Sequence, residues 1–407
     1  MSESPAAHTP LKGSSPFITG LGIAQICSWG SLYYSFPQIA AAMEVDLGWT
    51  STQIYGAATA GMLLSALAAV PVGTAIDRGY GKWVMTGGSI VAGLLLLAWS
   101  GVGDLIPFYL FVAGIGIMQA ATLYEPTFAV IARRAGPLRA RAGITAVTLW
   151  AGFASSAFFP LVELLMGYVG WRGTLQILGV LNIVVCAGLY FLVIEPAKDH
   201  YRPTRTAGRA SNAPLLAALR RPVFWALAMS LAFFAMFFSA LTYHLYPMLQ
   251  QRGLDATGIV FAMALIGPAQ VGGRFLISIF APKITARLLG SVVVLCFPAC
   301  ILVLLLGPAW LWIACLATVI YGTGTGIMTI VRGIAVPEMI SHESYGAISG
   351  AISTGMVLAR AVGPLAAAWI ALETGGYTAT LLAMLAVGIA IVLCFWAAAR
   401  AAGARAS

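Results

Sequence analysis

Four charged side chains lie inside long apolar stretches of this sequence: Glu125, Arg274, Arg332 and Arg360. A charge within a membrane-spanning segment is costly, so such groups usually face the protein interior and serve binding or ion coupling. Three arginines against one glutamate make that interior positive, and fixed positive charge in a low-dielectric cavity attracts anions. These residues therefore predict binding of a small organic anion, with Glu125 as the interior group that can carry a proton.

The depth of these residues distinguishes them further. At 1.5 Å per residue from the middle of its span, Arg360 lies within about 5 Å of the membrane midplane. Arg274 and Glu125 both come out about 9 Å to the cytoplasmic side. This matched depth allows a salt bridge between them that breaks when the two halves of the protein move. Alternatively, Glu125 pairs with Arg133 or Arg134.

Aromatic residues cluster in the outer halves of the first and seventh apolar stretches, in Tyr33-Tyr34 and in Tyr243-His244-Leu245-Tyr246. Tyrosine hydroxyls can bind an anion, and a histidine can titrate near neutral pH. The alternatives are a belt of tyrosines at the membrane interface and a solvated histidine near a helix end. The predicted substrate-binding residues are Arg360, Arg274, Tyr33, Tyr34, Tyr243 and His244.

The elements that hold these residues are membrane helices. The chain has 407 residues, of which 60% are hydrophobic and 9% are charged. A soluble domain carries about 25% charged residues, so a soluble enzyme is excluded. Each crossing needs about 20 apolar residues, which predicts an all-α polytopic membrane protein with twelve transmembrane helices. Their expected ranges are 17–42, 52–76, 83–101, 106–132, 142–168, 172–194, 223–249, 257–280, 286–306, 309–333, 344–371 and 376–399.

The positive charges set the expected orientation. With the N-terminus inside, 17 of the 22 lysines and arginines fall on the cytoplasmic side, and only Arg172 and Arg252 fall outside. Positive residues are retained in the cytoplasm, so both termini are predicted to be cytoplasmic, with the chain in the cell (inner) membrane. The net charge of +9 is then explained by topology and by attraction to membrane lipids, and it requires no nucleic acid.

The chain divides into two halves that resemble each other. The longest polar connection, residues 195–222, separates a predicted six-helix bundle at 1–194 from a second one at 223–407. Matching features recur at an offset of about 205–210 residues, for example Gly116-Ile117-Met118 and Gly326-Ile327-Met328. Such repeats are typical of transporters that bind substrate between the halves, near the midplane.

The loop after the second span is similar to a family signature. It reads Gly73-Thr74-Ala75-Ile76-Asp77-Arg78-Gly79-Tyr80-Gly81-Lys82 and resembles the Gly-x-x-x-Asp-Arg-x-x-Gly-Arg/Lys motif of the major facilitator superfamily. The resemblance covers the whole chain and implies two pseudo-symmetric six-helix bundles that work by alternating access. It also implies a monomer. The predicted cytoplasmic gate consists of Asp77, Arg78, Lys82 and Arg332.

A narrower resemblance is to the monocarboxylate and oxalate–formate porter branch. It rests on Trp29-Gly30-Ser31 in span 1, on Arg274 after two glycines in span 8, and on Arg360 in span 11. The branch implies membrane-embedded cations that hold carboxylates. The chain departs from it at Gly267-Pro268-Ala269-Gln270, where the acidic partner of the span 8 arginine is absent.

The sequence thus predicts a secondary active transporter of a small organic anion, most simply a carboxylate, with proton symport through Glu125 or anion exchange. It predicts no cofactor and no metal. One alternative is a proton-coupled exporter of amphipathic drugs or siderophore-like metabolites. The other is a membrane sensor that transports nothing.

Overall fold

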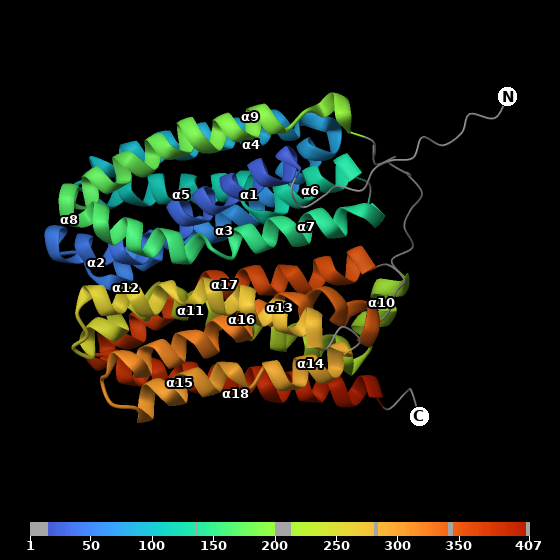
Figure 1. Cartoon of the computed structure of the whole chain (residues 1–407). Helices are drawn as coiled ribbons and strands as arrows, with labels where there is room; N and C mark the ends of the chain where they lie inside the picture. Colours follow the sequence, from blue (N-terminus) through green and yellow to red (C-terminus); the bar gives the residue numbers. More distant parts are fainter. Residues whose placement is uncertain (1–14, 136, 200–212, 281–283, 341–344, 404–407) are drawn as a thin grey trace.

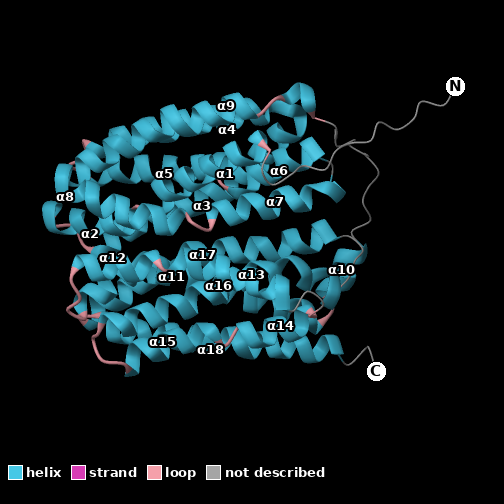
Figure 2. Ribbon diagram, in the orientation of Figure 1, coloured by secondary structure: helices cyan, strands magenta, loops and turns pink. Residues whose placement is uncertain are grey.

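The computed structural model describes residues 15–135, 137–199, 213–280, 284–340 and 345–403. This part of the chain is helical and contains no strand (Figure 2). The helices run along one common direction, and the N-terminal half lies beside the C-terminal half (Figure 1). Residues 200–212, within the predicted linker, lie outside the described residues, while α10 (Ala213–Leu219) occupies the end of that linker.

The N-terminal half contains α-helices interrupted by three π-helical turns, and a short 3-10 turn follows at the start of the linker. Its elements are α1 (Pro16–Trp29), η1 (Gly30–Tyr34), α2 (Phe36–Leu47), α3 (Ser51–Ala75), η2 (Ile76–Tyr80), α4 (Gly81–Ser100), α5 (Leu105–Thr122), α6 (Tyr124–Ala135), α7 (Pro137–Ala151), α8 (Ala154–Leu181), η3 (Asn182–Cys186), α9 (Ala187–Val193) and η4 (Pro196–Lys198).

The C-terminal half is built from longer, less interrupted helices. Its elements are α11 (Pro222–Gln251), α12 (Ala256–Ala264), α13 (Ile266–Phe280), α14 (Ala286–Val293), α15 (Cys296–Leu306), α16 (Leu311–Met339), α17 (Tyr345–Thr374) and α18 (Tyr377–Gly403). Following the predicted orientation, we call the end of the bundle that carries α10 the inner end and the opposite end the outer end (Figure 1).

The described ranges contain nine segments long and apolar enough to span a membrane. Two of them, Ser51–Ser100 and Ala142–Lys198, have 50 and 57 residues, more than twice what a hydrocarbon core of about 30 Å requires. Each reverses at a glycine with positive φ, Gly79 at 98° and Gly170 at 67°, a conformation that residues with a Cβ seldom adopt. These two segments therefore contribute four crossings. Residues 16–47, interrupted around η1, form one more long helical segment, so the structure confirms the all-α membrane fold and is consistent with the predicted twelve helices.

The two halves touch mainly along α3 and α17. Thr59 of α3 donates to the carbonyl of Ala361 at 2.8 Å, and Tyr55 donates to the carbonyl of Tyr243 in α11 at 3.0 Å. The buried residues of α3 all precede or include Met62, so its inner portion is not enclosed. The halves are therefore sealed more tightly toward the outer end along this helix than toward the inner end.

Candidate functional site

Arg360 of α17 lies among aromatic rings contributed by both halves. Its guanidinium carbon is 4.8 Å from the ring centroid of Tyr33, 5.6 Å from that of Trp29 and 5.7 Å from that of Phe238. These distances fit cation–π contacts. No carboxylate of the described chain forms a salt bridge with Arg360, and its buried Nε has no hydrogen-bond partner there. The cation is therefore held by ring faces rather than by a counter-ion.

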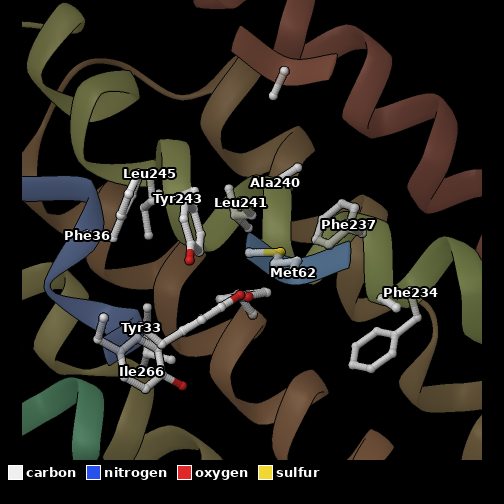
Figure 3. Packing of buried hydrophobic residues seen from close by; sticks show 14 of the residues in the cluster. Tyr33, Phe36, Met62, Phe234, Phe237, Ala240, Leu241, Tyr243, Leu245 and Ile266 are labelled. Atoms are coloured by element: carbon white, nitrogen blue, oxygen red, sulfur yellow. The ribbon is translucent and has the colours of Figure 1, made fainter. Parts of the chain in front are cut away.

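The predicted tyrosines join this cluster. The ring of Tyr243 contacts that of Tyr33 at 5.0 Å between centroids, although the two come from opposite halves. Figure 3 shows both among the side chains packed around α11. The ring of Tyr34 also packs against Tyr33, at 5.4 Å between centroids, and lies 6.1 Å from the ring of Trp29 and 5.6 Å from that of Phe159. Of the three predicted tyrosines, Tyr33 contacts the arginine directly, and Tyr34 and Tyr243 pack against Tyr33 and interact electrostatically with Arg360.

A π-helical turn positions these rings. In η1 the amide of Ser35 bonds to the carbonyl of Gly30, five residues back, at 2.9 Å. Pro37 follows this turn and has no N–H to continue the regular ladder. Gln119 of α5 donates its side-chain amide to the carbonyl of Leu32 at 2.7 Å, which satisfies an acceptor within the turn. Turns of this kind occur frequently at functional sites.

Arg274 of α13 has a different environment. Its Nε donates to the carbonyl of Gly326 in α16 at 3.1 Å, and its Nη1 donates to the carbonyl of Thr148 in α7 at 3.0 Å. The second bond joins the two halves. Arg274 nevertheless remains within electrostatic reach of Tyr34 and Tyr124, which also interact with Arg360. The two arginines therefore flank one tyrosine-lined region, but Arg274 is tied to backbone carbonyls.

Glu125 lies at the start of α6 with an exposed side chain. Its carboxylate is close enough to interact electrostatically with Arg360. The described residues show no salt bridge to Glu125. Arg133 instead pairs with Asp199 at 3.0 Å, and Arg134 donates to the carbonyl of Glu195 at 2.9 Å. Neither the predicted bridge to Arg274 nor the alternative pairing with these two arginines is present in this conformation.

His244 is fully buried near the outer end. Its Nε2 lies 2.8 Å from the carbonyl of Pro364, which can only accept, so Nε2 carries the proton. Its Nδ1 lies 3.0 Å from the hydroxyl of Tyr377, and its ring packs against Tyr55 with 4.2 Å between centroids. Both nitrogens are thus used in joining α11 to α17 and α18, which places this residue in the packing of the outer end.

The predicted gate residues lie at the inner end, around the turn after α3. Asp77 has an exposed side chain, and its backbone carbonyl accepts a 2.5 Å hydrogen bond from Arg133. Lys82 lies over the ring of Phe191 at 3.8 Å. These contacts all fall within the N-terminal half, so in this conformation they organise one half rather than join the two.

The remaining gate residues are exposed. Arg78 follows Asp77 in η2, and Arg332 of α16 donates to the hydroxyl of Ser353 in α17 at 3.2 Å. The contact of Arg332 lies within the C-terminal half. Its exposure agrees with an arginine that extends toward the membrane surface.

Sequence reasoning did not assign three residues that the fold brings to the site. Trp29 precedes Tyr33 by one helical turn, and Phe238 follows Tyr33 by 205 residues, within the offset of the repeat. Tyr124, next to Glu125, has its ring 4.8 Å from that of Trp29. The repeat offset and the helical period are the signals by which the first two could have been found.

Comparisons with known proteins agree with this architecture. The sequence model of the Major Facilitator Superfamily matches residues 21–354. Human monocarboxylate transporter 11 is 26% identical over 371 residues, which cover 86% of this chain and 75% of that protein.

Two solved structures share the fold. A bacterial homologue of the human lysosomal transporter Spinster, in an inward-facing and unoccupied conformation, gives a TM-score of 0.74 at 15% identity, covering 95% of this chain and 98% of that one. The nucleoside transporter NupG, in a mutant form, gives a TM-score of 0.78 at 12% identity, covering 94% and 98%.

Proposed function

The chain belongs to the Major Facilitator Superfamily, and from this premise we propose that it carries a small organic anion, a carboxylate, across the cell membrane by alternating access. Membership of that family makes the chain a membrane transporter rather than an enzyme. We further propose that both termini are cytoplasmic, as the 17 basic residues assigned to that side favour. The human relative is a monocarboxylate transporter by name, which is compatible with this substrate class.

The observation that carries the proposal is the state of Arg360. It lies between the halves, where substrate binds in transporters with repeated halves, and it has no salt bridge to the described chain. An uncompensated guanidinium is costly in a membrane protein, and a bound carboxylate would supply both the charge and the hydrogen-bond acceptors. Tyr33 contacts this guanidinium, and the rings of Tyr34 and Tyr243 pack against Tyr33.

Coupling follows from the charge near this site. Glu125 is exposed and interacts electrostatically with Arg360, which supports a role as the carboxylate that takes a proton during symport. Exchange of one anion for another is the alternative, because an incoming anion can also neutralise Arg360. The two modes differ in what drives uptake, and one experiment separates them.

The experiment reconstitutes the protein in proteoliposomes and measures uptake of labelled formate, pyruvate, lactate and benzoate. Wild type is compared with Arg360→Ala, and the expected loss is about a hundredfold or more, because a buried charge-assisted contact disappears. Arg172→Ala, at an exposed arginine of the outer end, is the matched control and should retain uptake.

Uptake is measured with an imposed proton gradient and, separately, with vesicles preloaded with unlabelled acid. Stimulation by the gradient indicates symport, and stimulation only by preloading indicates exchange. Equal uptake by wild type and Arg360→Ala would contradict the central role of Arg360. No uptake of any acid by wild type would contradict the proposed substrate class.

A further inference from the structure

Buried hydrogen-bond donors without a partner gather at the Arg360 site. In the described ranges, seven buried side-chain donors have no hydrogen-bond partner: Trp29 Nε1, Tyr33 Oη, Thr86 Oγ1, Ser89 Oγ, Trp99 Nε1, Ser155 Oγ and Arg360 Nε. Three of these seven belong to one cluster, in which Tyr33 and Arg360 also interact with each other. The rings of Trp29 and Tyr33 are 5.4 Å apart between centroids, and the Arg360 guanidinium carbon lies within 5.6 Å of both.

Packing alone does not account for an indole at position 29. A buried donor has lost its hydrogen bonds to water, and leaving it unpaired costs free energy. A phenylalanine would present a similar ring to Arg360 and Tyr33 without that cost. Phe238, the third ring beside the Arg360 guanidinium, contacts the cation in this way with a side chain that has no polar atom. The indole N–H therefore needs an explanation other than its ring.

A carboxylate matches the three donors. Its two oxygens offer about four acceptor sites, and hydrogen bonds to an ionised acceptor are stronger than those between neutral groups. If the guanidinium binds one carboxylate oxygen, neutral donors beside it can bind the other oxygen without adding a second positive charge to the site. Trp29 and Tyr33 lie one helical turn apart across the start of η1, and both rings lie beside the Arg360 guanidinium.

We propose that Trp29 is a substrate-binding residue whose indole N–H, with the Tyr33 hydroxyl and the Arg360 Nε–H, donates to the carboxylate of the transported anion. This inference rests on the proposed function, which supplies the acceptor. It adds a neutral donor to the charged residue, so that affinity depends on hydrogen-bond geometry as well as on charge.

The test compares Trp29→Phe with Trp99→Phe in purified protein. Trp99 is the matched control because its buried Nε1 also lacks a partner, while its ring packs between Phe36 and Phe108 at 5.7 Å from each. Calorimetry measures binding of formate, pyruvate, lactate and benzoate. For the acid that wild type binds most tightly, Trp29→Phe should weaken binding about tenfold or more, and Trp99→Phe should bind as wild type does.

Thermal unfolding gives a second readout. Without acid, Trp29→Phe should unfold no earlier than wild type, because it removes an unpaired donor. With saturating acid, its upward shift in unfolding temperature should be smaller, because a weaker ligand stabilises less.

The outcomes separate the two proposals. If wild type and Trp29→Phe bind the acids equally while Arg360→Ala loses binding, the role of Trp29 is wrong and the proposed function stands. An equal loss in Trp29→Phe and Trp99→Phe also contradicts the role of Trp29. If wild type binds none of the four acids, the proposed function fails, and the inference fails with it.

Discussion

Arg360 and Arg274 are both partly buried arginines of the C-terminal half, and their surroundings differ in kind. Arg274 gives its Nε and Nη1 to the backbone carbonyls of Gly326 and Thr148. Arg360 has ring faces around its guanidinium, and its Nε has no partner among the described residues. The Nε of Arg274 therefore has an acceptor within the protein, whereas the Nε of Arg360 has none among the described residues.

This difference shows why charge inside a membrane span is insufficient to assign a binding role. A guanidinium has five N–H donors in a fixed fork, and backbone carbonyls can satisfy some of them as well as a ligand can. An arginine bonded to carbonyls on two helices holds those helices together. For Arg274 the bond to Thr148 joins the halves, so its contribution is to their relative position.

The strongest test of the comparison replaces each arginine with glutamine. Arg274→Gln should lower the free energy of unfolding by about 2 kcal/mol or more, because two carbonyls lose a charged donor. Arg360→Gln should leave the unfolding temperature unchanged or raise it, because it removes a cation without a carboxylate partner. Thermal unfolding of both purified variants in the same detergent, without added acid, measures the effect.

Transport kinetics extend this test. Arg274→Gln should change the maximal rate more than KM, because the bond between the halves is altered while the Arg360 cluster is kept. The roles assigned to the two arginines are contradicted if Arg360→Gln is less stable than Arg274→Gln. They are also contradicted if Arg274→Gln loses substrate affinity as completely as Arg360→Ala.

The sequence was sufficient for the fold because membrane spans need long apolar runs and positive-inside loops, and both are local properties. It also located Arg360, whose depth follows from its position within a span. The acceptors of Arg274 could not be predicted, since the carbonyls of Thr148 and Gly326 are 126 and 52 residues away and have no sequence signature. His244 shows the same limit, because its partners Pro364 and Tyr377 are brought to it only by packing.

A smaller effect is expected from the residue that holds the π-helical turn beside Arg360. Gln119→Leu removes the 2.7 Å hydrogen bond to the Leu32 carbonyl while keeping the side-chain volume similar. The loss of about 1 kcal/mol should relax the turn and move Tyr33, which raises KM about fivefold with little change in maximal rate. Uptake kinetics in proteoliposomes measure this split.

Gln176→Leu is the control for this substitution. Its side-chain amide bonds to the hydroxyl of Ser100 at 3.4 Å in the outer part of the N-terminal half, away from the Arg360 cluster. It should leave KM unchanged. If Gln119→Leu lowers the maximal rate with KM unchanged, the turn acts in the conformational change and not in shaping the site.

The smallest effect is expected at a third arginine, Arg172, which forms a solvent-exposed ion pair with Asp46. At the outer end, Asp46 accepts hydrogen bonds from Arg172 and, at 3.1 Å, from Trp171 Nε1, and these bonds hold the pKa of Asp46 below its usual value. A carboxyl with a lowered pKa in the folded state stabilises the fold above its unfolded pKa of about 4, and this contribution disappears as the pH falls through the folded pKa. Asp46→Asn should therefore unfold slightly earlier than wild type at pH 7, with the difference vanishing below about pH 4. The difference should be small because exposed ion pairs contribute little.

Thermal unfolding of wild type and Asp46→Asn from pH 7 down to about pH 3 measures this difference. A difference in unfolding temperature that persists at the acidic end would show that the amide disturbs packing around Trp171 instead of removing a charge.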